Sequence, residues 1–244
     1  MKINYPVTAA LFLLASCATY SQQAVKLAQL NVTHKASQDD STAKDSSKNV
    51  VDFFIGGGFV TGPSDEGDKI EYGASREFIV GMGYARKLVK WNAVGIDLYY
   101  KSTGFFLTQD SSKILPNGVL HNAEKISINN LGGVIFDRFY FGKLFLDGGF
   151  YYDWALITKH VAYDNFTVAN NNGGSSTKSI DRQLVFMNDY NYGLTFRFGQ
   201  VNGVALYFNY RLTNVFTKGT ASNPSLFYNL PFPPFVIGLV VGTF

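Results

Sequence analysis

The sequence predicts an all-β protein, an eight-stranded antiparallel up-and-down transmembrane β-barrel with short periplasmic turns and long extracellular loops. Three observations carry this prediction. Segments from about Val50 to Phe244 alternate apolar and polar residues with the period of a strand. The connections between these segments alternate between short and long. The 244 residues include 22 Phe, 15 Tyr and 24 Gly, yet none of the apolar runs is long enough for a transmembrane helix.

The N-terminus has the features of a signal peptide, which we assign to residues 1–21. A positive start at Met1-Lys2 precedes an apolar run over residues 7–15. Two processing routes stay open. Leu14-Ala15-Ser16-Cys17 fits a lipobox, which would leave Cys17 as a lipidated N-terminus. Cleavage after Ser21 would instead remove the only cysteine, and by either route the barrel contains no disulfide.

Residues 22–49 differ in composition from the rest of the chain. Ser, Lys, Asp, Thr and Gln dominate and aromatic residues are absent, which predicts a flexible periplasmic tail. The remaining residues, 50–244, have the length of one domain. The formal net charge is only +3 and no dense block of Lys or Arg occurs, so we do not expect a nucleic-acid partner.

The first four strands are expected near residues 51–60, 77–85, 94–101 and 126–139. The first carries Gly56-Gly57-Gly58, which weakens its pattern. The second and third alternate clearly, with apolar residues at every second position from Phe78 and from Val94. The fourth is predicted to change face at Asn129-Asn130 through a bulge.

The last four strands are expected near residues 144–156, 186–198, 204–213 and 235–244. The fifth, sixth and seventh alternate clearly; in the seventh, Leu206, Phe208 and Tyr210 oppose Tyr207 and Asn209. The eighth is apolar at both parities, so its outward face cannot be assigned from the sequence.

The connections predict the orientation of the barrel. Tight connections are expected near residues 87–90, 141–143 and 200–203, and the other connections are long and polar. All seven prolines lie outside the eight strands, in the signal peptide, in long loops or at a strand start, as the loss of a ladder donor requires. An even number of strands brings both ends of the barrel to one side, so the short turns would face the periplasm and the long loops the exterior.

Alternation alone does not decide which face points outward, and a soluble lipocalin-like ligand-binding barrel is an alternative. The apolar face is rich in Phe, Tyr and Trp, whereas the other face carries Gly, Ala and charges of both signs, which favours apolar residues outside. We therefore predict a plugged lumen with a ladder of ion pairs rather than a proton or cation path. The predicted ladder consists of Glu77, Asp97, Lys101, Asp147, Asp153, Asp189, Arg197 and Arg211.

Aromatic residues cluster where interfacial girdles are expected. Those near the short turns are Trp91, Phe139, Tyr140, Phe141 and Phe145, and those near the long loops are Phe105, Phe106, Phe216, Phe227 and Phe232.

Several segments resemble the PorT-like outer-membrane β-barrel family of Bacteroidota. They are the Tyr-Ser-Gln-Gln at the signal-peptide end, residues 189–199 and 209–216, and the terminal Gly-Leu-Val-Val-Gly-Thr-Phe. The resemblance covers roughly residue 50 to the end. It implies an outer-membrane location and an assembly signal at Phe244 read by the barrel-assembly machinery, although Gly242 stands where many such signals carry an aromatic residue. Some relatives assist the type IX secretion system.

A lipid-modifying enzyme is an alternative, because some eight-stranded outer-membrane barrels are enzymes of this kind. His121 and His160 lie at the long-loop ends of neighbouring strands, and a hydrolase would need a Ser and an acid beside one of them. Ser102, Ser111, Ser112 or Ser127 would have to reach His121, and Asp164 or Asp181 would have to reach His160. No spacing singles out a triad or a metal site, so we expect both histidines to be solvated loop residues.

We therefore predict a monomeric, non-enzymatic envelope protein with a structural, adhesive or secretion-accessory role and no cofactor. Its expected partners are outer-membrane lipid and lipopolysaccharide, the barrel-assembly machinery during biogenesis, and an envelope or secretion protein. The apolar, proline-rich loop over residues 223–235 is either a binding surface or a part of the girdle. The acidic first loop suggests divalent cations near lipopolysaccharide, although a solvated surface is favoured.

Overall fold

The computed structural model describes residues 49–64, 68–167, 174–220, 223–224 and 226–244. The predicted signal peptide, Cys17 and all of the predicted tail except Asn49 lie outside these residues. Asn49 is the first residue of strand β1 (Asn49–Thr61), so the barrel begins one residue before the predicted boundary.

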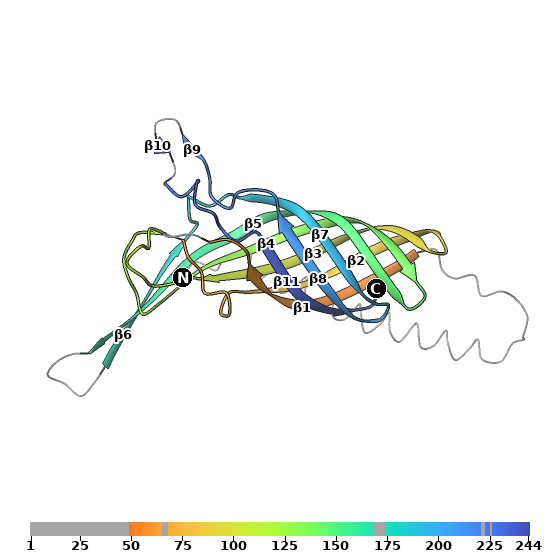
Figure 1. Ribbon diagram of the computed structural model, residues 1–244, viewed down its shortest axis with the longest axis horizontal. Helices are drawn as coiled ribbons and strands as arrows, with labels where there is room; N and C mark the ends of the chain where they lie inside the picture. Colours follow the sequence, from red (N-terminus) through yellow and green to blue (C-terminus); the bar gives the residue numbers. More distant parts are fainter. Residues whose placement is uncertain (1–48, 65–67, 168–173, 221–222, 225) are drawn as a thin grey trace, which may run out of the picture. The chain divides into compact units, whose positions relative to one another are not determined.

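Eight antiparallel strands form a closed up-and-down barrel, as predicted (Figure 1). Each strand pairs with the next along the chain, and β1 pairs with β11 to complete the circle. The barrel strands are β1, β2 (Arg76–Val89), β3 (Asn92–Phe106), β4 (Ala123–Phe141), β5 (Leu144–Thr167), β7 (Tyr190–Gln200), β8 (Gly203–Arg211) and β11 (Phe235–Gly242). Within the described residues there is no helix long and apolar enough to cross a membrane.

The two ends of the barrel differ. At one, which we call the turn end, two-residue connections join β2 to β3, β4 to β5 and β7 to β8. Gly142 and Asn202 in these turns have φ values of 68° and 58°, a left-handed conformation that Gly and Asn tolerate best. Strand β1 starts and β11 ends at the turn end. The other connections lie at the opposite end, which we call the loop end.

Strand β5 is 24 residues long and runs past the barrel at the loop end. There it pairs with β6 (Gly174–Arg182) in a hairpin that projects from the barrel (Figure 1). The short strands β9 (Gly219–Thr220) and β10 (Asn223–Pro224) form a second small ladder at the same end. Strand β6 is not evident from the sequence, because Gly174–Arg182 lacks apolar alternation and pairs through its backbone.

Alternate residues of each barrel strand point inward, and the structure assigns the two strands of unclear parity. In β1, Phe53 and Ile55 face outward while Asp52 and Phe54 face inward. In β11, outward Ile237, Leu239 and Val241 alternate with inward Gly238 and Val240. The interior therefore accepts apolar residues as well as charges, which is why the last strand is apolar at both parities.

The predicted change of face in β4 is wrong. Its even-numbered residues are buried from Glu124 to Arg138 without interruption. A register shift does occur between Asn129 and Asn130, but the extra residue, Leu156, belongs to β5. The apparent reversal in β4 has another cause: its outward residues near the loop end, such as Ser127, are polar, and the inward Ile126 is apolar.

Two apolar clusters fill the barrel. One occupies the turn half and includes Phe54, Phe136, Phe145 and Phe244. The second closes the loop end and joins barrel residues to residues of the loops, among them Ile70, Leu115, Met187, Val215 and Phe216. We call this second cluster the mouth cluster.

Part of the predicted girdles is therefore wrong. Phe105, Phe216 and Phe232 belong to the mouth cluster, and Phe145 lies in the turn-half cluster. Trp91 and Phe141 do face outward at the turn end. The proline-rich loop is also reassigned in part, because Phe227, Leu230 and Phe232 pack inward where an exposed surface or a girdle was expected, although Leu226 is exposed.

Candidate functional site

The barrel interior near the turn end holds a network of buried ion pairs centred on Arg138. The guanidinium of Arg138 donates to both oxygens of Asp147, from Nε at 2.7 Å and Nη2 at 3.0 Å. Its Nη1 donates to Asp52 Oδ2 at 2.8 Å. Arg138, Asp147 and Asp52 are each no more than 1 % exposed. Removing one partner from such a group leaves an uncompensated buried charge.

Arg197 continues this network toward the middle of the barrel. Its Nη1 lies 2.7 Å from Asp97 Oδ2 and its Nη2 lies 2.8 Å from Asp147 Oδ2. These contacts are ion pairs and not hydrogen bonds, because Arg197 Nη2 and both carboxylate oxygens of Asp97 have no hydrogen-bond partner. Asp147 thus links the two arginines into one network.

Phe244 closes this network at the turn end. Its side chain is buried, with ring centroids 4.9 Å from Phe145 and 6.4 Å from Phe54. Its ring also lies within 6 Å of the Arg138 and Arg197 guanidinium carbons. In the folded barrel the predicted assembly-signal residue is therefore part of the interior.

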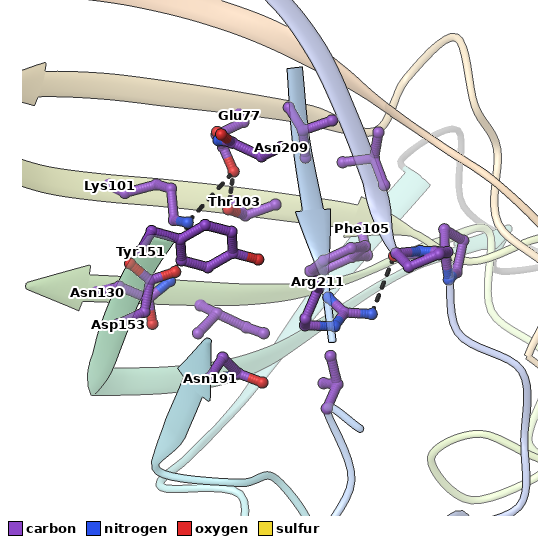
Figure 2. Close-up of a pocket in the computed structure, with 16 residues that line it drawn as sticks. Glu77, Lys101, Thr103, Phe105, Asn130, Tyr151, Asp153, Asn191, Asn209 and Arg211 are labelled. Carbon is purple, nitrogen blue, oxygen red and sulfur yellow. Dashed lines mark hydrogen bonds and ion pairs between the residues drawn. The ribbon is translucent and has the colours of Figure 1, made fainter. Parts of the chain in front are cut away.

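The middle of the interior holds a second charged group, centred on Lys101 (Figure 2). The Lys101 ammonium pairs closely with Asp153 and lies 4.0 Å from Glu77 Oε2. Thr103 donates to Glu77 at 3.0 Å. Tyr99 donates to Asp153 Oδ1 at 2.7 Å, so each carboxylate has a hydroxyl donor as well as the cation.

Glycines in the barrel wall leave space for aromatic side chains that point into the interior. A Cβ on Gly193 would lie 2.8 Å from the ring of Tyr151, and a Cβ on Gly132 would lie 2.6 Å from the ring of Tyr99. Because real Cβ atoms do not approach so closely, larger residues at these positions would displace the rings. The Tyr151 ring in turn lies 4.8 Å from the Lys101 ammonium.

Two small cavities lie within this packing. The first, of about 40 Å³, is lined by Glu77, Lys101, Asn130, Asp153 and Arg211 among others (Figure 2). The second, of about 20 Å³, lies nearer the turn end beside Asp97 and Arg197. A water molecule needs about 10–15 Å³ of such volume, so each cavity has room for only one to a few waters.

Arg211 lies at the boundary between these charges and the mouth cluster. Its Nη2 donates to the carbonyl oxygens of Phe232 and Pro233 at 3.1 and 3.0 Å. Its Nε donates to the Thr213 carbonyl at 3.2 Å. Arg211 therefore attaches the proline-rich loop to the barrel, and the mouth cluster covers the first cavity at the loop end.

The structure places seven of the eight predicted ladder residues, all except Asp189, in the interior. They form two groups, one around Lys101 and one around Arg197, rather than one continuous ladder. Arg211 binds backbone carbonyls, and within the described residues it pairs with no carboxylate. The assignment of Asp189 is wrong: it precedes β7, its side chain is exposed, and its carbonyl accepts from Ala155 N.

Sequence reasoning missed Asp52 and Arg138, although Arg138 organises the largest buried network. Both lie on strands without clear alternation, β1 and β4. The available signal was a charged residue beside aromatic residues, as Asp52 precedes Phe53 and Arg138 precedes Phe139. The buried tyrosines that support the carboxylates, Tyr99 and Tyr207, carried no separate sequence signal.

A third polar group lies at the loop end, where Glu124 is buried. His160 Nε2 lies 2.6 Å from Glu124 Oε1, and its Nδ1 lies 3.1 Å from Asp181. Lys113 pairs with Glu124, and Gln109 donates to it at 2.8 Å. This group attaches the loop between β3 and β4 to the barrel wall. The expectation that His160 is a solvated loop residue is therefore wrong, because it is buried in β5.

The charged forms of His160 and Glu124 stabilise each other. The hydrogen bond to Glu124 raises the pKa of His160, despite the opposing effect of burial. For Glu124, burial tends to raise the pKa, but hydrogen bonds from His160, Lys113 and Gln109 outweigh it, so the pKa is lowered. An imidazolium–carboxylate pair therefore holds this loop at pH values between the ordinary pKa values of the two groups.

His121 pairs with Asp164, whose Oδ2 lies 2.9 Å from Nδ1, and the two histidine rings lie 6.4 Å apart. Of the two acids considered for His160, Asp181 contacts it, whereas Asp164 contacts His121. Within the described part of the chain, neither histidine has a serine or cysteine as a hydrogen-bond partner. Those same residues contain no cluster of three metal-ligating side chains.

Comparison with known proteins gave no relatives: the chain matches no protein-family model and no curated protein sequence.

Proposed function

We propose that this protein is an integral barrel of a bacterial outer membrane, with a filled interior and a non-enzymatic role in the cell envelope. The observation that carries the proposal is an outward apolar belt around all eight barrel strands. Ile135 is 70 % exposed and Phe150 is 66 % exposed. Other large side chains of the belt include Ile55, Met82, Leu98, Phe196, Leu206 and Leu239. Soluble monomers rarely expose apolar patches beyond a few hundred Å².

The height of the belt fits a bilayer. On β5 the outward positions are apolar or aromatic from Leu144 to Trp154, with Gly148 as the exception. About ten residues at roughly 3.3 Å each, tilted by about 40°, span close to 25 Å, the height of the apolar band of outer-membrane barrels. Tyr152, Trp154 and Tyr190 lie at its loop-end edge and Trp91 at its turn-end edge, where interfacial aromatics are expected.

A soluble ligand-binding barrel would need an interior of another kind. Ligand pockets usually measure about 300–1,000 Å³. The cavities here measure about 40 and 20 Å³ and lie among ion pairs. This favours the membrane barrel over the lipocalin-like alternative, and it favours a structural interior over a diffusion pore.

The role is proposed to lie at the loop end, as a structural, adhesive or secretion-accessory component. The resemblance to PorT-like barrels of Bacteroidota supports the secretion-accessory form and the use of Phe244 as an assembly signal. With the short turns toward the periplasm, the mouth cluster and the β6 hairpin would face the exterior.

A lipid-modifying enzyme is the second candidate, favoured by one observation: His121 Nδ1 contacts Asp164 while its Nε2 has no hydrogen-bond partner. A lipid A deacylation or acyl-transfer assay of the protein and its His121→Ala and His160→Ala variants tests it. Activity lost in either variant would overturn the non-enzymatic role.

Fractionation tests the membrane proposal. The full chain is expressed in a Gram-negative host, the outer membranes are washed with carbonate, and gel mobility is compared with and without boiling. Retention in the membrane and a mobility shift on boiling are expected. A soluble protein without a shift would contradict the proposal and favour a soluble periplasmic barrel.

A further inference from the structure

A groove of about 450 Å³ lies on the outward side of β3, β4, β5 and β6, at the loop end. Four cationic side chains line it: Lys125, Lys159, Lys178 and Arg182. Lys178 and Arg182 are exposed, and Lys125 and Lys159 are half-buried. The groove lies outside the barrel and shares no residue with the interior network.

The strand register brings these charges together. Lys159 stands directly opposite Arg182, and Lys125 stands opposite Val161, which makes Lys125 a diagonal neighbour of Lys159. The Lys125 side chain lies beside Gly104 of β3, where a Cβ would be in ordinary van der Waals contact with its end at 3.5–3.7 Å. Like charges that face each other across a strand pair are destabilising unless an anion offsets them.

The carboxylates of the same strands point the other way. Glu124 and Asp181 contact His160, and Asp164 contacts His121. None of the residues that line the groove is acidic. Among the described residues, none of the four cations has a carboxylate within 4.0 Å. The outward face therefore has an uncompensated positive charge.

The groove also contains neutral groups suited to an amphipathic ligand. The Ser102 hydroxyl donates to Asn129 Oδ1 at 2.7 Å, and the Ser127 hydroxyl and the Asn129 amide nitrogen supply donors to the groove. Phe106 and Tyr163 lie beneath Lys125 and Lys178, with the ammonium groups 5.4 and 5.3 Å from the ring centroids.

The groove begins where the apolar belt ends. Asn129, at the edge of the groove, is two residues from the outward Leu131 of the belt, and Lys159 is three residues from Leu156. A lipid with its acyl chains against the belt would hold its headgroup at this height.

We propose that this groove binds the phosphate groups of an outer-leaflet lipid whose acyl chains lie against the belt below it. The inference rests on the proposed membrane location and adds a defined headgroup site. Lys159 and Arg182 form the centre of the site, with Lys125 and Lys178 beside them. Lipid A, which carries two phosphates, matches this spread of charge.

The test uses the full chain purified in detergent, with bound lipid counted by native mass spectrometry. The probes are bisphosphorylated lipid A, the same lipid without phosphates, and inorganic phosphate as competitor. Wild type is expected to prefer the phosphorylated lipid. Lys159→Gln/Arg182→Gln should weaken its binding about 30-fold, from the usual contribution of two cations near a lipid surface.

Two control variants separate the site from general charge and from folding. Lys90→Gln/Lys143→Gln removes two exposed cations at the turn end and should leave binding unchanged. Lys159→Arg/Arg182→Lys keeps both charges and should bind within about threefold of wild type.

Equal binding of the lipid with and without phosphates would overturn the inference, as would equal losses in the groove and turn-end variants. Displacement by millimolar inorganic phosphate would assign the site to a free anion and overturn the lipid source. If any of these results is obtained with a protein that is retained in the membrane and shifts in mobility on boiling, the lipid site is refuted but the proposed membrane location is not. A soluble protein without a mobility shift refutes that proposal itself.

Discussion

The two halves of strand β5 both alternate between inward and outward residues, yet their outward faces differ. From residue 144 to 155 the outward side chains include Leu146, Phe150 and Trp154. From residue 158 to 167 they include Lys159, and the strand pairs there with the polar β6. The extra residue Leu156 separates the halves and reverses which parity points inward.

The difference shows that the alternation of a strand and the composition of its outward face carry different information. Alternation reports which side of a strand faces the interior, whereas the composition of the outward face reports its surroundings. Inside the barrel both halves are charged, with Asp147 bound to Arg138 in one and His160 bound to Glu124 in the other. Outside, the first half is suited to hydrocarbon and the second to an anionic aqueous boundary.

The largest effect is expected in the interior of the turn half. Arg138→Met keeps much of the side-chain volume but leaves Asp52 without its cation and Asp147 with Arg197 alone, and breaking a buried pair in this way costs about 3–5 kcal/mol. The measurement is the free energy of unfolding in urea, for the barrel refolded in lipid vesicles. Arg86→Met, at an exposed turn-end position of β2, is the matched control and should change it by about 0.5 kcal/mol or less. A loss below about 1 kcal/mol for Arg138→Met would contradict the network's importance.

The second-largest effect is the difference in stability between a charge placed on one outward face of β5 and the same charge placed on the other. Phe150→Arg places a charge in the belt and should lower the free energy of unfolding in vesicles by about 2–4 kcal/mol. Val161→Arg places the same charge on the loop-end half and should lower it by about 0–1 kcal/mol. Equal losses for the two variants would mean that the halves have the same surroundings.

The smallest effect concerns pH and the loop-end half. Because the pKa of His160 is raised above 6.5, its contribution is complete below that value and is lost as pH rises through the folded-state pKa. Because the pKa of Glu124 is lowered below 4.5, its contribution is present above that value and is lost as pH falls through its folded-state pKa. The pair therefore holds the loop most firmly between about pH 4.5 and 6.5.

Hydrogen exchange of residues 109–124, corrected for intrinsic rates, checks this expectation. Exchange should speed up from pH 6.5 to 8.5 in wild type, and His160→Gln should abolish most of that dependence. If the exchange rate depended on pH equally in wild type and in His160→Gln, His160 would be excluded as the titrating group.

Much of the fold could be predicted from the sequence, because five strands alternate clearly and three of the connections are tight. Strands β1, β4 and β11 were harder for a physical reason. The interior contains apolar residues such as Phe54 and Val240 next to its charges, so inward and outward residues of β1 and β11 have similar polarity. In β4 the outward face itself changes, from Ile135 in the belt to Ser127 beyond it.

The site was predictable only in part, because pairing depends on the barrel register. Arg138 meets Asp52 across 86 positions of sequence, a contact that no local spacing reveals. The mouth cluster likewise depends on loops that fold inward, which places Phe216 and Phe232 inside although their composition suggested an interfacial girdle. The acid partners of the histidines depend on the register between β4, β5 and β6.

The central claim is that the outward face of β5 passes from hydrocarbon to water along its length. Nitroxide labels at Tyr152→Cys and Val161→Cys test it, in a Cys17→Ser chain refolded into lipid vesicles, because Cys17 is the only native cysteine. The measurement is the accessibility of each label to oxygen and to a water-soluble nickel complex. The account predicts that oxygen dominates at position 152 and the nickel complex at position 161. Equal access of the nickel complex to both positions would contradict it.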